Sequence, residues 1–196
     1  TGVQTCALPI YGRFAEMLLF HNYQHVLKFK KLQTAKTVYG MIAAAGYKNW
    51  GMVISFIEDS RMKELNSKYR HKDSSTDILS FPAYKCLHQM NPRPTSSNPY
   101  LGEIFISTPF VYEYCQQDKL DITKHFNVLY AHGISHLLGY DHETDAEYEE
   151  MKKVEKSILD HYTEYMEEYD PMADGLFDSW NWDTKEVDFT LCCTQI

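Results

Sequence analysis

The chain has 196 residues, of which 44% are hydrophobic, and its formal net charge at pH 7 is −8. This length and composition suffice to bury the core of one domain. No run of eighteen apolar residues occurs, which excludes a typical membrane-spanning helix, and the five scattered cysteines favour a reducing compartment over a disulfide-built fold.

The first ten residues, TGVQTCALPI, resemble the translation of a sequencing-library adapter, and we interpret them as an artefact outside the fold. The domain is expected to span residues 11–166. Because the authentic N-terminus is expected to be missing, the sequence leaves open whether the protein works in the cytoplasm or in an organelle such as a mitochondrion or plastid.

The first predicted elements are two strands with a helix between them. Residues 16–22 (EMLLFHN) form a short apolar run typical of a buried strand. Thr34 is predicted to cap an amphipathic helix that ends at Gly46. Residues 50–57 (WGMVISFI) predict the second strand.

A second helix is predicted to begin at Asp59 or Ser60, and a third strand follows over residues 77–82 (DILSFP). Residues 84–100 are polar and contain three prolines, which predicts a loop. Residues 101–107 (LGEIFIS) predict the fourth strand.

Three helices complete the predicted domain. Thr108 and Pro109 are a cap and a first-turn proline, residues 122–138 form the longest clearly patterned helix, and Thr144 with Glu147 forms a capping box for the last one. The order of elements predicts an α+β fold, with a roughly four-stranded mixed sheet packed against about five helices.

The acidic residues are concentrated at the C-terminal end. Residues 167–196 contain eight acids and one lysine, a charge of −7 that leaves only −1 for residues 11–166. We therefore expect a weakly ordered acidic tail. The nearly neutral body can hold a local basic groove for a polyanion.

Residues 132–142 (HGISHLLGYDH) contain three histidines in eleven positions. On a helix, His132 and His136 lie one turn apart on the same face. Gly139 suits a left-handed helix stop, after which His142 can turn back toward the other two. Three imidazoles with an open fourth position are typical of a catalytic zinc ion, so we predict one metal site at the end of a central helix.

This motif, together with residues 66–82 (NSKYRHKDSSTDILSFP) and 101–107, resembles the YbeY family of zinc-dependent endoribonucleases. The similarity covers roughly residues 16–165. It implies an α+β fold, one Zn²⁺ on the three histidines, and cleavage of single-stranded RNA during maturation of small-subunit ribosomal RNA and ribosome biogenesis. The implied partners are single-stranded RNA, ribosomal RNA or the small ribosomal subunit, without DNA or a membrane.

Arg70 matches the arginine of the family's Asn-x-x-Tyr-Arg segment and is the predicted catalytic residue, because a guanidinium binds two phosphate oxygens at once. The alternative is that Arg70 pairs with Asp73 or Asp77 and only orders the loop. Asp77 and Asp141 are candidates for orienting the histidines. For Asp141, a role in forming the turn is an equally good alternative.

Two other functions fit parts of this sequence. Zinc peptidases carry H-E-x-x-H, and here Gly133 stands in place of the glutamate that serves as general base. The second is a non-catalytic ribosome-associated factor with a structural metal ion. Such a site would have a fourth protein ligand, from Asp141 or a cysteine. For RNA cleavage, the sequence leaves open whether water or the RNA's own 2′-hydroxyl attacks the phosphate.

Overall fold

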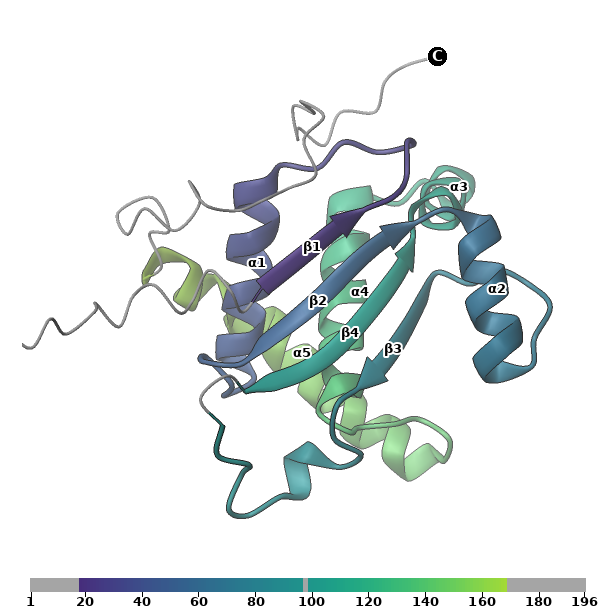
Figure 1. The fold of residues 1–196 in the computed structure, drawn as a ribbon. Coiled ribbons are helices and arrows are strands. Elements are labelled where there is room, and N and C mark those ends of the chain that lie inside the picture. The colour runs from purple at the N-terminus through teal and green to yellow at the C-terminus, as the bar shows by residue number, and fades with distance from the viewer. Residues whose placement is uncertain (1–17, 97–98, 169–196) are drawn as a thin grey trace, which may run out of the picture.

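The structure is a computed structural model that describes residues 18–96 and 99–168 (Figure 1). The adapter-like residues 1–10 and nearly all of the acidic segment 167–196 lie outside these ranges, and both assignments stay predictions. The elements are β1 (Leu18–Asn22), α1 (Lys31–Ala44), β2 (Gly51–Ile57), α2 (Asp59–Arg70), β3 (Ile78–Pro82), a short 3-10 helix (Leu87–Gln89), β4 (Tyr100–Ser107), α3 (Thr108–Asp118), α4 (Ile122–Leu137) and α5 (Asp145–Glu168).

The strands form one mixed sheet in the order β1-β2-β4-β3. β1, β2 and β4 run parallel, and β3 pairs antiparallel with β4 at the edge of the sheet (Figure 1). In the central register, Ile54 of β2 lies between Phe20 of β1 and Ile104 of β4. This four-stranded sheet with five α-helices confirms the predicted α+β fold.

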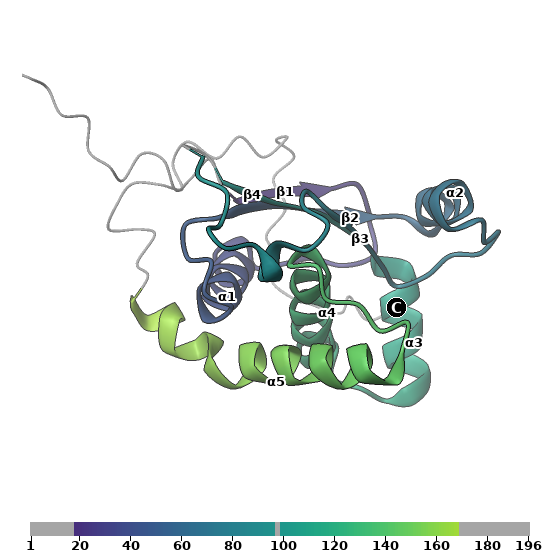
Figure 2. The same cartoon turned by 90° about the horizontal axis from the view of Figure 1, so that it is seen from below.

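The helices form two layers on one face of the sheet. α1 and α4 lie directly against the sheet, and α5 crosses beneath both of them (Figure 2). α2 packs instead on the opposite face near β3, where its Met62 and Leu65 form a second small cluster with Ile57 and Leu79. The main core therefore lies between the sheet and the α1–α4 layer.

Aromatic stacking fills the centre of the main core. Phe29 stacks on Phe56 with ring centroids 4.2 Å apart and meets Phe126 edge-on at 5.2 Å. Burying each such side chain contributes roughly 1.5–3 kcal/mol. Phe126 belongs to α4, so this cluster fixes the helix that carries the first two histidines.

A glycine lets α4 approach the sheet closely. A Cβ atom at Gly133 would lie 3.0 Å from Cδ1 of Ile78 and 3.1 Å from Cγ2 of Ile104. These contacts are tighter than ordinary van der Waals separation, so a larger residue would push α4 away from the sheet. Position 133 therefore faces β3 and β4.

The predicted start of the first helix is wrong. α1 begins at Lys31, and Thr34 lies inside its first turn, where its backbone N–H donates to the carbonyl of Lys30 at 2.9 Å. No side chain caps this helix; instead Phe29, just before it, is 3% exposed and enters the core. Tertiary packing thus sets the start of α1, whereas the predicted stop at Gly46, with φ of +83°, is confirmed.

Part of the predicted 84–100 loop docks on the end of α4. Leu87 of the 3-10 helix is fully buried, and His88 donates hydrogen bonds from both its backbone N–H and Nδ1 to the carbonyl of Leu138, each at 2.9 Å.

Through the ranges that the structure covers, no helix is both long and apolar enough to cross a membrane.

Candidate metal centre

The end of α4 has the geometry that the histidine motif requires. Gly139 has a φ of +91°, and its N–H donates to the carbonyl of His136 at 2.9 Å, while the N–H of Tyr140 reaches the carbonyl of Ser135 at 3.1 Å. These bonds satisfy carbonyls at the helix end and turn the chain. A Cβ at Gly139 would also lie 2.7 Å from Cα of Cys86, so both conformation and space require glycine.

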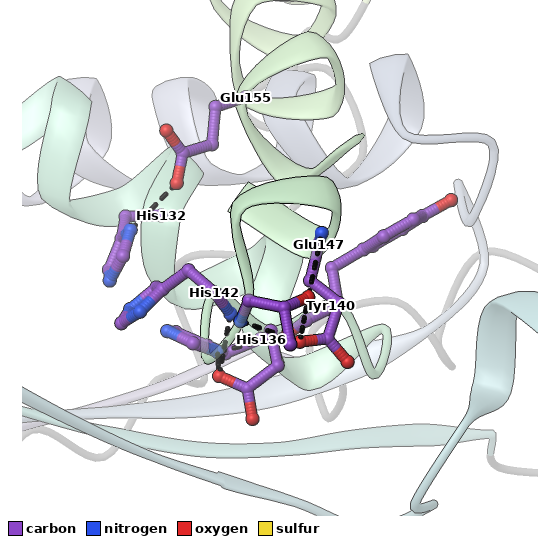
Figure 3. A network of polar contacts seen from close by, with 8 residues as sticks. His132, His136, Tyr140, His142, Glu147 and Glu155 are labelled. Carbon is purple, nitrogen blue, oxygen red and sulfur yellow. Dashed lines mark hydrogen bonds and ion pairs between the residues drawn. The ribbon is translucent and has the colours of Figure 1, made fainter. Parts of the chain in front are cut away.

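The three histidines converge beyond this turn. One ring nitrogen from each of His132, His136 and His142 lies within 4.8 Å of the others, and the ring centroids are 4.6, 5.5 and 5.0 Å apart. Figure 3 shows the three rings gathered at one point. The predicted three-histidine cluster at the end of the central helix is thus confirmed.

The donor set fits a zinc-like ion. Imidazole nitrogens suit zinc and other late transition metals, and three of them leave a coordination position for solvent or substrate. Among the residues that the structure describes, no cysteine or carboxylate joins the three histidines in the cluster.

Glu155 of α5 orients His132. Nδ1 of His132 lies 2.7 Å from Oε1 of Glu155, in the geometry of a hydrogen bond donated by the ring (Figure 3). Such a bond fixes the tautomer and leaves Nε2 as the metal-binding nitrogen. Glu155 is not among the residues predicted from the sequence, although its carboxylate stands on the inward face of α5 between the buried Met151 and Ile158, an unusual place for an acid.

His136 is held by the turn itself. Its Nδ1 donates to the carbonyl of Tyr140 at 3.0 Å (Figure 3). Burial lowers the pKa of His136 to about 4, and the neighbouring His132 and His142 are the next causes of this shift. The ring is therefore neutral at physiological pH, which is the state in which imidazole binds a metal ion.

Asp141 and Asp77 both lie at the site, with different contacts. Oδ1 of Asp141 accepts the N–H of His142 at 2.9 Å and lies 3.9 Å from Nδ1 of His136, too far for a hydrogen bond. Oδ1 of Asp77 accepts from the N–H of Ile78 at 2.8 Å and from the hydroxyl of Thr76 at 3.0 Å. Neither carboxylate forms a hydrogen bond to a ring of the cluster.

The histidines open on a cavity of about 580 Å³, which we call the metal cleft. Arg70 and Lys85 are the cations that line it. The predicted alternative partners of Arg70 are engaged elsewhere, since Asp73 pairs with Lys63 at 3.3 Å and Asp77 bonds to its neighbours. Among the described residues, no acid forms an ion pair with Arg70.

The fold and the site together define an α+β protein with a three-imidazole metal-ligand cluster in a cleft that also contains an arginine. The family model described as "Endoribonuclease YbeY" matches residues 19–163, and the chain belongs to the YbeY family.

Proteins named Endoribonuclease YbeY are similar to this chain at moderate identity. One from Thermodesulfovibrio yellowstonii is 45% identical over 107 residues, which cover 54% of this chain and 63% of the relative. One from Pseudomonas entomophila is 37% identical over 128 residues, with coverages of 65% and 75%. The human protein is 28% identical over 145 residues, with coverages of 73% and 86%. The chain thus spans just under two thirds of the length of the T. yellowstonii relative.

Proposed function

We propose that the chain is a zinc-dependent endoribonuclease that cleaves single-stranded RNA during maturation of small-subunit ribosomal RNA and so serves ribosome biogenesis. The observation that carries this proposal is the convergence of His132, His136 and His142 in one cleft with Arg70. Membership of the YbeY family adds support, because its relatives bear the name endoribonuclease.

We assign one Zn²⁺ to the three histidines. When bound, zinc supplies a Lewis acid that offsets negative charge on a phosphate and lowers the pKa of water. The protein's own part is to hold three neutral rings in place. Glu155 fixes His132 at 2.7 Å, and the carbonyl of Tyr140 fixes His136 at 3.0 Å.

Arg70 supplies the positive charge that a phosphate requires. Its guanidinium stays protonated and can bind two phosphate oxygens in a planar, bidentate arrangement. Because Arg70 lines the metal cleft and forms no ion pair with a described residue, its donors are available to a substrate. The nucleophile can be either water or the 2′-hydroxyl of the RNA, because this set of residues is compatible with both.

The surroundings of position 133 disfavour peptide hydrolysis. A Cβ at this position would already lie 3.0 Å from Ile78 and 3.1 Å from Ile104, which leaves no room for a glutamate there. Among the described residues, Glu147 is the one glutamate lining the cleft, and its Oε2 accepts from the N–H and the hydroxyl of Thr144 at 2.9 and 2.8 Å. The capping box thus engages Oε2 of the one glutamate in the cleft, and glutamate is the residue that serves zinc peptidases as general base.

The open side of the cluster disfavours a purely structural metal. Structural zinc sites are closed by four protein ligands and are usually rich in cysteine. Cys86 lines the metal cleft but does not join the group of ligand atoms formed by the histidines. A cluster of three imidazoles that faces a cleft favours a metal ion accessible to substrate.

The substrate class is tested by incubating one preparation with a single-stranded RNA, a duplex of the same sequence and a peptide library. We expect cleavage of the single strand only, abolished by a chelator and by His136→Ala. Peptide products that depend on the metal would instead support a peptidase. RNA binding without cleavage at saturating zinc would support a non-catalytic binding factor.

A further inference from the structure

A second cavity lies next to the metal cleft, between the end of α1, the 84–96 segment and α5. It measures about 310 Å³, and we call it the side pocket; its polar and aromatic lining consists mainly of Tyr47, His88, Arg93, Tyr140 and Lys153. None of the described residues that line it is acidic. Nothing in the proposed chemistry at the metal centre uses this pocket.

Tyr140 joins the side pocket to the metal centre. Its carbonyl holds His136 at 3.0 Å, whereas its side chain points away from the three histidines (Figure 3). The Tyr140 ring stacks on His88 with centroids 4.0 Å apart and an interplanar angle of 19°. Tyr140 also lines both cavities, so the side pocket and the metal cleft share this residue as a wall.

Two cations from different segments line this pocket. The guanidinium of Arg93 lies 4.1 Å from the centre of the Tyr47 ring and donates one hydrogen bond, of 2.8 Å, to the carbonyl of Gly46. A guanidinium has five N–H donors, and among the described residues Gly46 is the one hydrogen-bond acceptor that Arg93 contacts. Lys153 is exposed on α5, and within the described ranges it forms no ion pair.

We propose that the side pocket binds a nucleotide of the single-stranded RNA that flanks the nucleotide at the metal cleft. Aromatic rings for base contacts beside Arg and Lys for phosphates are the combination with which proteins bind single-stranded RNA. The volume lies at the lower end of the range for small-ligand pockets, roughly 300–1,000 Å³, which suits one nucleotide. The inference rests on the proposed function in one respect: the ligand is the same RNA strand.

The test compares Lys153→Gln with Lys152→Gln, two adjacent substitutions that remove the same charge from α5. Nζ of Lys152 lies 5.5 Å from the Tyr148 ring, and this residue does not line the side pocket. Binding of a fluorescent single-stranded oligoribonucleotide to the zinc-loaded protein is followed by anisotropy at several salt concentrations, at a temperature and time at which gel analysis detects no cleavage.

We expect Lys153→Gln to weaken binding roughly three- to fivefold at low salt. The slope of log affinity against log salt should also shrink by about 0.7, the value for one lost phosphate contact on a single strand. Lys152→Gln should bind as the wild type does. Adding Arg93→Gln should produce a second decrease, after thermal unfolding has shown that the double variant is folded.

The possible outcomes separate this inference from the proposed function. Equal affinities of the Lys153→Gln and Lys152→Gln variants would overturn the inference, even if the enzyme cleaves RNA. An oligoglutamate peptide of matched charge is a second control. If Lys153→Gln weakens binding of this peptide as much as it weakens RNA binding, the inference is also overturned, because the peptide has no nucleobase. RNA binding that depends on Lys153, without cleavage by the zinc-loaded protein, would support the side pocket and reject the proposed function.

Discussion

The carboxylate of Glu155 determines which nitrogen of His132 faces the metal centre. We expect Glu155→Gln to weaken zinc binding roughly 10- to 100-fold, since residues that orient metal ligands have effects of this size. Competition with a chelating dye measures the dissociation constant. Glu149→Gln, an exposed substitution on the same helix, is the control. Equal zinc affinity in the two variants would show that the negative charge of the Glu155 carboxylate, 2.7 Å from Nδ1 of His132, does not support the site.

Arg70 and Arg61 allow a matched comparison within α2. Arg70 lines the metal cleft, whereas Arg61 pairs with Glu64 on the exposed surface at 2.7 Å. We expect Arg70→Gln to keep its zinc and to lower kcat/KM on single-stranded RNA by about 100-fold or more, the effect of removing one preorganised donor. Arg61→Gln should cleave as the wild type does. Similar rates for both variants would remove Arg70 from the catalytic site.

The lowered pKa of His136 predicts a pH dependence of stability in the metal-free protein. Because the pKa falls from 6.5 in the unfolded chain to about 4 in the folded one, the unfolded state binds an extra proton between these values. The free energy of unfolding should therefore decrease as the pH falls from 6.5 to 4, by up to about 3 kcal/mol.

Urea unfolding of chelator-treated protein at several pH values measures this contribution. His136→Gln removes the titrating ring, so the variant should lose less stability than the wild type over the same range. If both proteins have the same pH dependence, burial of His136 does not determine it.

The turn after α4 is the element that brings His142 to the other two ligands. Gly139 and Gly46 both have a positive φ, of +91° and +83°, but they differ in the space available around the Cα atom. A Cβ at Gly139 meets backbone atoms at 2.7 Å, whereas one at Gly46 meets only Nη2 of Arg93 at 3.9 Å.

We expect Gly46→Ala to cost about 1–2 kcal/mol from backbone conformation alone. Gly139→Ala should cost roughly 3 kcal/mol or more, because the clash adds to that strain. It should also weaken zinc binding by displacing His142. Urea unfolding compares the two variants. Equal losses of stability would mean that residues 85–86 move away from the new Cβ atom without lowering the free energy of unfolding.

Short-range sequence patterns predicted much of the architecture, because strands, helix ends and capping boxes depend mainly on residues that are close in the chain. The four apolar runs became strands, Gly46 and Gly139 end their helices, and Thr144 with Glu147 forms the capping box. Thr34 failed as a cap because Phe29, buried in the core, sets the start of α1.

The features that the sequence did not reveal depend on contacts between distant segments. The antiparallel edge position of β3 follows from pairing with β4, which comes later in the chain. Glu155 reaches His132 across the packing of α5 on α4, and no short-range pattern contains both residues. The side pocket likewise unites α1, the 84–96 segment and α5. Such sites require the fold before they can be recognised.

The proposed RNA cleavage depends on a catalytic metal ion held by the three histidines. The most direct measurement is to strip the protein of metal and titrate it with zinc while following cleavage of single-stranded RNA. We predict that cleavage is absent at the start, rises in proportion to zinc and levels off at one ion per chain, and that His136→Ala shows no such rise. Full cleavage by the stripped protein, or saturation with zinc without any cleavage, would contradict a catalytic role for the metal ion.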